Sequence, residues 1–222
     1  MKKLFIFSAL AASATAFSQY AEKRSQFGIT AGVHGSHIHG IHQDSEARVA
    51  PSVGVFFEAP ISQRSTSELS RSGGLFFAPQ VEYSMQGEYN KYPGGKQKFF
   101  ADFINLPILL KYYFGAKANS GLNSSWFLTV GPKVGFIVNQ KVSGDSINDP
   151  TTGINYIDLH FNDNDEFNKF DFGVVGGLGY AFDNHWQLML RYDHGFTKMY
   201  DNTPHDKTTY NYKLGLSVNY GF

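Results

Sequence analysis

The last thirteen residues alternate strictly between two kinds of side chain, and this alternation constrains the fold more than any other feature of the chain. Every second residue is apolar or aromatic: Tyr210, Tyr212, Leu214, Leu216, Val218, Tyr220 and Phe222. The residues between them are polar or small: Asn211, Lys213, Gly215, Ser217, Asn219 and Gly221. Successive side chains of a β-strand point to opposite faces, so this segment predicts a strand with one apolar and one polar face.

The same alternation recurs along the chain and predicts an all-β protein. The other segments lie near residues 26–34, 51–59, 75–86, 104–114, 126–138, 170–182 and 186–192. We therefore expect a closed up-and-down antiparallel transmembrane β-barrel of about eight strands, because a closed barrel is the sheet that can span lipid without unpaired edges. No stretch supplies about 18 uninterrupted apolar residues, so we expect no transmembrane helix.

The distribution of aromatic residues indicates which face meets lipid. In residues 210–222 the apolar face has tyrosine or phenylalanine at both ends and leucine or valine in the middle. A strand rise of about 3.3 Å per residue with a tilt of about 40° places these aromatic bands roughly 20–30 Å apart, close to the apolar belt of a membrane barrel. An aromatic content of 16% and 23 glycines suit such a barrel. The alternative is a soluble lipocalin-like barrel with the faces reversed.

The connections between the segments alternate in length. Residues 36–47, 87–98, 140–168 and 197–208 are expected to be long loops, and the link at Asp183–His185 is very short. The links at 60–72 and 116–124 are intermediate. Long outer loops and shorter periplasmic turns are typical of bacterial barrels, so we expect both ends of the mature chain in the periplasm.

The N-terminus has the features of an export signal. Lys2 and Lys3 precede an apolar run at 4–12, and the small residues Ala16 and Ser18 flank Phe17 at the expected cleavage site. We predict a signal peptide at residues 1–18 and an outer-membrane barrel domain at residues 19–222. The alternative for the first segment is a buried N-terminal helix.

Charged residues at mid-strand on the polar faces suggest an ion-pair network in the lumen. They are Glu82, Lys111, Lys133, Asp171, Arg191 and Lys213. Eight-stranded barrels are just wide enough to be filled by side chains, and buried charges need partners. We expect these residues to pair and to leave no substantial pore. A proton or ion path is the alternative interpretation.

Other patterns carry weaker expectations. His34, His37, His39 and His42 fall in the first predicted outer loop; His37, His39 and His42 are weak metal candidates, since imidazole binds zinc, copper and nickel. A solvated loop is the simpler interpretation. The chain has no cysteine and a formal net charge of zero, which argues against thiolate chemistry and nucleic-acid binding. We expect no cofactor.

Several segments resemble the PorT-like family of small outer-membrane β-barrels. They are residues 104–114, 130–136 and 172–180, together with the terminal Tyr220–Phe222. The resemblance implies a barrel in the outer membrane of a Gram-negative cell, and its named member is associated with protein secretion and gliding. It supplies no catalytic residues. Tyr220 and Phe222 resemble the terminal signal read by the barrel assembly machinery.

These observations together predict a non-enzymatic barrel, structural or associated with secretion and the envelope, that displays extracellular loops. The expected partners are outer-membrane lipid, the assembly machinery during biogenesis, and other envelope or secretion proteins. The alternative is a lipid-active or ligand-binding barrel with its site at the outer rim. Ser36 beside His37, and His194 or His205 near Asp193 or Asp206, supply catalytic residue types, but no G-x-S-x-G motif accompanies them.

Overall fold

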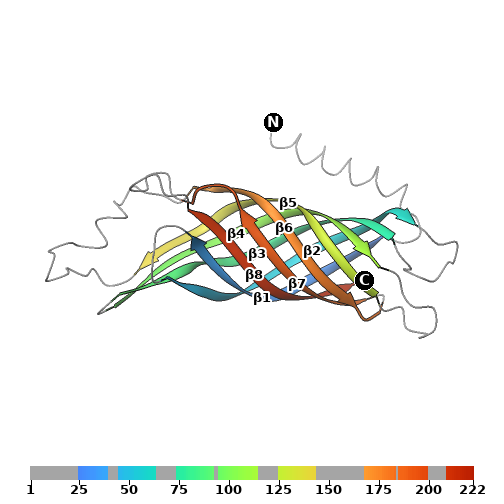
Figure 1. Cartoon of the computed structure of the whole chain (residues 1–222), viewed down its shortest axis with the longest axis horizontal. Helices are drawn as coiled ribbons and strands as arrows, with labels where there is room; N and C mark the ends of the chain where they lie inside the picture. The colour runs from blue at the N-terminus through green and yellow to red at the C-terminus, as the bar shows by residue number, and fades with distance from the viewer. Residues whose placement is uncertain are drawn as a thin grey trace.

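The chain forms one closed antiparallel barrel of eight strands. The computed structural model describes residues 25–39, 45–63, 74–92, 95–114, 125–143, 168–183, 185–199 and 209–222. The strands are β1 (Gln26–His39), β2 (Ser45–Gln63), β3 (Gly74–Tyr92), β4 (Gly95–Tyr113), β5 (Ser125–Ser143), β6 (Phe170–Ala181), β7 (Trp186–Gly195) and β8 (Tyr210–Gly221). Each strand pairs with its neighbours in the sequence, and β1 pairs with β8 to close the sheet (Figure 1). The predicted fold class is confirmed.

The two faces of the wall are as the alternation predicts. On β8, Leu214, Leu216 and Val218 are exposed on the outside, whereas Lys213 and Asn219 are buried inside. The exposed apolar side chains continue around the barrel, and the buried polar side chains line its interior. The polar face therefore points inward, and the soluble barrel with reversed faces is wrong. Within the described residues, no helix is long and apolar enough to cross a membrane.

The strands are longer than expected at one end, which we name the projecting end. β1 continues to His39, β2 begins at Ser45, and β3 and β4 are joined by a hairpin in which Tyr92 pairs with Gly95. The predicted loops at 36–47 and 87–98 are therefore largely wrong. The reason is that pairing continues beyond the apolar belt, held by contacts such as the edge-to-face rings of Tyr89 and Phe100 at 5.4 Å.

The other predicted connections are only partly visible. β5 extends to Ser143 and β2 extends to Gln63, which shortens the links expected at 140–168 and 60–72. The rest of those links, the link at 116–124 and most of 197–208 lie outside the described residues. The short link at Asp183–His185 joins β6 and β7 at the opposite end, which we name the turn end and which also holds the C-terminus (Figure 1).

The wall has one long side and one short side. β2, β3, β4 and β5 have 19 residues each, whereas β6, β7, β8 and β1 have between 10 and 14. The β1–β2 ladder ends at Ser36↔Arg48 and the β5–β6 ladder at Phe136↔Phe170, while the four long strands continue. They form a projecting sheet, residues 45–48, 87–92, 95–101 and 138–143, seen where the green and yellow strands extend furthest in Figure 1.

The ladder between β2 and β3 is interrupted below this sheet. A register shift separates the pairs Ala47↔Glu88 and Ser52↔Ser84. Side chains contact the backbone of β3 here: Arg48 Nη1 donates to Gln86 O at 2.7 Å, and Ser36 Oγ donates to Gly87 O at 2.9 Å. Gly87 has a φ of 127°, which glycine adopts at little cost. These side-chain hydrogen bonds therefore keep the barrel wall closed at the β-bulge between β2 and β3.

Candidate functional site

Eight of the buried charged side chains lie on the inner face of the barrel and pair with one another. Four are acidic and four are basic, so the set is balanced: Glu58, Glu82, Asp171 and Asp193 with Lys111, Lys133, Arg191 and Lys213. The alternation of each strand turns these side chains inward, and barrel closure brings together strands far apart in the sequence. We call this set the lumen network.

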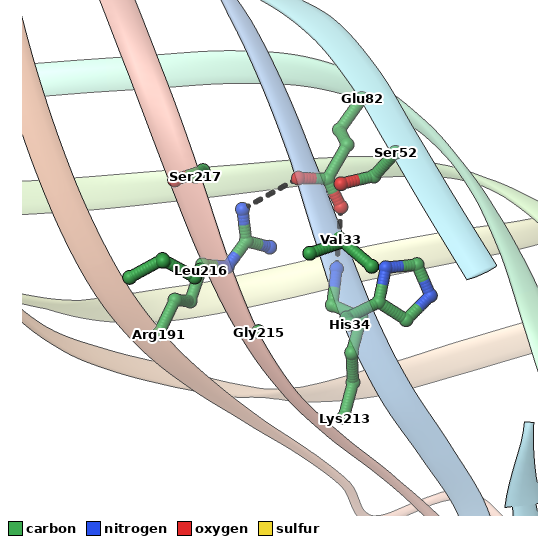
Figure 2. A pocket seen from close by; sticks show the side chains of 9 residues that line it. All are labelled: Val33, His34, Ser52, Glu82, Arg191, Lys213, Gly215, Leu216 and Ser217. Carbon is green, nitrogen blue, oxygen red and sulfur yellow. Dashed lines mark hydrogen bonds and ion pairs between the residues drawn. The ribbon is translucent and has the colours of Figure 1, made fainter. Parts of the chain in front are cut away.

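The central layer of the network joins four charges on three strands. Glu82 of β3 accepts hydrogen bonds from Arg191 Nη1 at 2.8 Å and from Lys213 Nζ at 2.5 Å. Asp193 accepts two bonds from Arg191, at 2.6 and 2.7 Å, and its Oδ2 lies 3.1 Å from Lys213 Nζ. Figure 2 shows Arg191 and Lys213 converging on Glu82. Paired hydrogen bonds of this kind between guanidinium and carboxylate are among the stronger ones in proteins.

A second layer lies nearer the turn end and combines one ion pair with aromatic rings. Lys111 Nζ donates to Glu58 at 2.9 Å and to Gln187 at 2.6 Å, and the Tyr113 hydroxyl donates to Glu58 at 2.8 Å. The ammonium group also lies 4.2 Å from the ring centroid of Phe127. A buried cluster packs around this pair: Phe76, Tyr113, Phe127, Ala181 and Met189.

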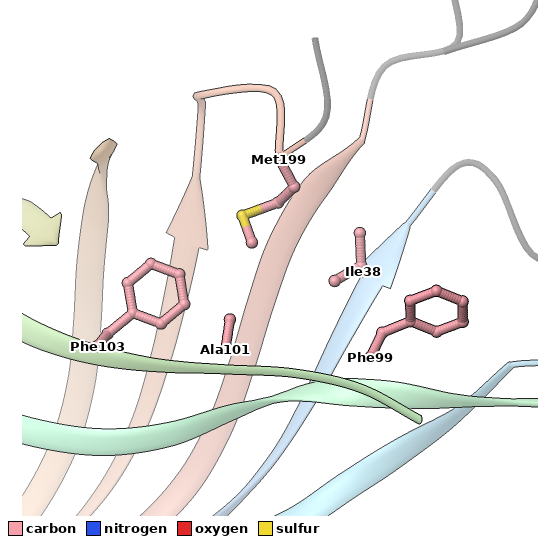
Figure 3. Close-up of a cluster of buried hydrophobic side chains, with 5 residues drawn as sticks. All are labelled: Ile38, Phe99, Ala101, Phe103 and Met199. Atoms are coloured by element: carbon pink, nitrogen blue, oxygen red, sulfur yellow. The ribbon is translucent and has the colours of Figure 1, made fainter. Parts of the chain in front are cut away.

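The remaining pair and a second apolar cluster lie nearer the projecting end. Lys133 Nζ is 2.9 Å from Asp171 Oδ2, with both side chains buried. Beyond them, Ile38, Phe99, Ala101, Phe103 and Met199 form a buried cluster (Figure 3). Apolar clusters thus accompany the charges toward both ends of the interior: one surrounds the Lys111–Glu58 pair, and one lies beyond Lys133 and Asp171.

A small cavity lies inside this arrangement. A cavity of about 10 Å³ beside the central layer is lined by residues that include His34, Glu82 and Ser217 (Figure 2). That volume is at the lower limit for one water molecule. Such an interior can hold the wall together and block passage; it does not resemble an aqueous channel.

Sequence comparison now places the chain in a family. The family model for the outer membrane protein beta-barrel domain matches residues 17–201. The chain belongs to this family. It is therefore an outer-membrane barrel, and no curated protein matches it.

Solved structures with the same architecture are similar to this outer-membrane barrel only in fold. The outer membrane enzyme PagL is 9% identical with a TM-score of 0.45, covering 86% of this chain and 97% of its own. OprG from Pseudomonas aeruginosa is 12% identical with a TM-score of 0.42, covering 90% and 97%. Neisserial surface protein A is 13% identical with a TM-score of 0.40, covering 89% and 97%. Identities this low say nothing about a shared activity.

The six charges singled out in the sequence all lie on the inner face of this outer-membrane barrel. Glu82 meets Arg191 and Lys213, and Asp171 meets Lys133. Lys111 pairs with Glu58 instead of with either of the predicted acids. Sequence reasoning missed Glu58 and Asp193 because both lie toward strand ends, although both stand at inward positions of the alternation.

Three of the histidines, His34, His37 and His39, lie on β1 and not in a loop, so their predicted position is wrong. His34 points inward, with Nε2 2.9 Å from Met85 O. His37 and His39 lie on the other face, and His37 Nδ1 is 3.0 Å from Ser45 Oγ and 3.4 Å from a Glu88 oxygen. His42 lies outside the described residues. Among the described residues, no three histidine, aspartate or glutamate side chains are placed to share a metal ion.

The C-terminal residues complete the barrel at the turn end. Tyr220 packs on Trp186 with ring centroids 4.7 Å apart, and the Phe222 N–H donates to Phe27 O at 2.8 Å. The Phe222 side chain is exposed. Its recognition by the assembly machinery stays a prediction, as does the signal peptide at residues 1–18, which lies outside the described residues.

Proposed function

We propose that this protein is a non-enzymatic, non-conducting barrel that acts as a structural or secretion-associated component of the envelope and presents its projecting sheet outside the cell. The observation that carries this proposal is the filled lumen, in which eight paired charges are packed together with apolar clusters. Opening a path through the lumen would break buried ion pairs, and a buried charge without its partner costs free energy.

The shape of the wall supports a role at the cell surface. Short turns face the periplasm in bacterial barrels, so the short β6–β7 link supports an orientation with the projecting sheet outside. Its outer strand β5 has exposed side chains at Val138, Asn139, Gln140 and Lys141. Exposed strand and loop surfaces on a rigid scaffold are frequent sites of binding.

The geometry gives no support to the catalytic pairs that the sequence offers. Ser36 is buried inside, where its hydroxyl bonds to Gly87, whereas His37 lies on the other face of β1. Asp193 points into the lumen network and His194 packs outside against Tyr212 at 4.7 Å. Neighbours in a strand cannot meet across the wall. His205 and Asp206 lie outside the described residues.

The resemblance to the PorT-like family suggests secretion as the envelope process involved. The test is quantitative proteomics of the culture medium and cell surface in a strain that lacks the gene. The strain is complemented with the wild type or with a variant in which Asn-Gly replaces residues 89–98. Glu88 pairs with Phe99, so a two-residue turn there keeps the register of the hairpin.

The two complemented strains separate the barrel from its projecting sheet. We expect the deletion to deplete secreted and surface-attached proteins, the wild type to restore them, and the shortened variant to insert normally without restoring them. An unchanged secretome in the deletion strain would remove the secretion role. Full restoration by the shortened variant would show that the β3–β4 hairpin of the projecting sheet is not needed for that role.

A further inference from the structure

A groove on the outer surface at the turn end belongs to neither the lumen network nor the projecting sheet. It has a volume of about 370 Å³, within the range of about 300–1,000 Å³ that is typical of small-molecule sites. It lies where β6, β7 and β8 meet and is lined by Phe182, Asp183, Trp186, Gln187, Leu188 and Val218.

The walls of the groove are apolar and form a continuous surface. Leu188 pairs with Val218 across β7 and β8, and Trp186 pairs with Tyr220, whose ring supports the indole at 4.7 Å. Phe182 and Trp186 are each about half exposed, at 51% and 49%. The side chain of Gln187 turns inward to Lys111 and is fully buried. An alkyl chain is the ligand that such walls suit.

One carboxylate stands at the groove and is held in place by the backbone. Asp183 Oδ1 accepts hydrogen bonds from the N–H groups of His185 and Trp186, both at 2.7 Å. These bonds fix the short β6–β7 link in an Asx-type turn. The side chain of Asp183 is exposed, so its negative charge lies beside the apolar walls at the membrane surface. This charge complements an ammonium group.

The membrane leaflet beside the groove determines which lipids with an alkyl chain and an ammonium group can reach it. In the orientation proposed above, the turn end faces the periplasm, so the groove opens into the inner, phospholipid leaflet of the outer membrane. We infer that the groove binds one phospholipid with an ammonium headgroup, such as phosphatidylethanolamine. An acyl chain lies along Trp186, Leu188 and Val218, and the ammonium group lies against Asp183.

The test is native mass spectrometry of the detergent-purified barrel with phosphatidylethanolamine or phosphatidylglycerol of identical acyl chains. We expect one phosphatidylethanolamine to be retained about fivefold better than phosphatidylglycerol, which converts to about 1 kcal/mol. Asp183→Asn should abolish this preference without unfolding the barrel, because the amide oxygen still accepts both backbone N–H bonds. Heat-modifiable migration on gels reports whether each variant is folded.

The chain offers a matched control for the apolar wall, because it has only two tryptophans. Trp126 also lies at the turn end, is 55% exposed and packs on Tyr180 at 5.1 Å, but it does not line the groove. Trp186→Ala should lose the retained lipid and Trp126→Ala should keep it. Equal loss in both variants would mean general lipid contact and would overturn the inference.

A second measurement uses the remaining tryptophan as a reporter. In Trp126→Phe, Trp186 is the only tryptophan, and phosphatidylethanolamine with brominated acyl chains should quench its fluorescence at lower lipid fractions than brominated phosphatidylglycerol. Identical quenching by the two lipids, unchanged by Asp183→Asn, would overturn the assignment of an ammonium headgroup.

Discussion

The two charged layers of the lumen are built in different ways. In the central layer, Glu82, Asp193, Arg191 and Lys213 mainly satisfy one another. In the layer near the turn end, the pair of Lys111 and Glu58 has neutral neighbours that include the Tyr113 hydroxyl and the Gln187 amide. The comparison shows that a buried charge can be held by other charges or by polar and aromatic neighbours. The consequences of removing one partner should therefore differ.

The largest effect is expected for Arg191→Met in the central layer. It leaves Glu82 and Asp193 with Lys213 as the remaining base of that layer, so one negative charge is buried without compensation. Breaking a buried pair typically costs about 3–5 kcal/mol, and we expect a loss of that size in the free energy of unfolding. Reversible urea unfolding in lipid vesicles measures it. Arg191→Lys, which keeps the charge, should lose less; a loss below about 1 kcal/mol in Arg191→Met would contradict the account.

A smaller effect is expected for Lys111→Met near the turn end. Glu58 keeps its bond from Tyr113, so we expect a loss of about 2 kcal/mol. The double variant Glu58→Gln with Lys111→Met removes both charges and should be more stable than Lys111→Met alone. If the double variant loses the sum of the two single losses, Glu58 and Lys111 are not energetically coupled.

The smallest effect is expected for Tyr113→Phe, which keeps the ring and deletes the hydroxyl. The ring contacts with Phe76 and Phe127, at 5.2 and 5.4 Å, remain in this variant. Losing one hydrogen bond to a carboxylate that is still paired with Lys111 should cost about 1 kcal/mol. Combined with Lys111→Met, the same substitution should cost more, because Glu58 then loses the hydrogen bonds from both Lys111 and Tyr113. If the loss in the double variant equals the sum of the two single losses, Lys111 and Tyr113 do not stabilise Glu58 jointly.

The number of strands, and which side chains point inward or outward, could be predicted from the sequence alone. Alternation decides which side chains share a face, so Leu216 outside and Lys213 inside follow from residues 210–222 alone. The ion-pair partners across the lumen could not be predicted from the sequence. Lys111 meets Glu58 because of the stagger of the strands around the barrel, a property of closure that no single strand encodes.

The ends of the strands were also beyond prediction from the sequence. Residues 87–98 are rich in polar and glycine residues and look like a loop, yet pairing continues through them once β3 and β4 are aligned below. The bulge opposite Gly87 depends on contacts from Ser36 and Arg48, which come close only in the folded barrel. The groove beside Asp183 likewise depends on the meeting of β6, β7 and β8.

The central claim is that the lumen is closed, and single-channel recording of the purified full-length protein in planar bilayers tests it most directly. Insertion is verified by heat-modifiable migration of protein recovered from the same lipid. We expect no stable current steps above the leak of the bare bilayer at either polarity. Reproducible ohmic steps from the folded wild type would contradict the account, because the lumen network and its two apolar clusters would then have to leave an open path.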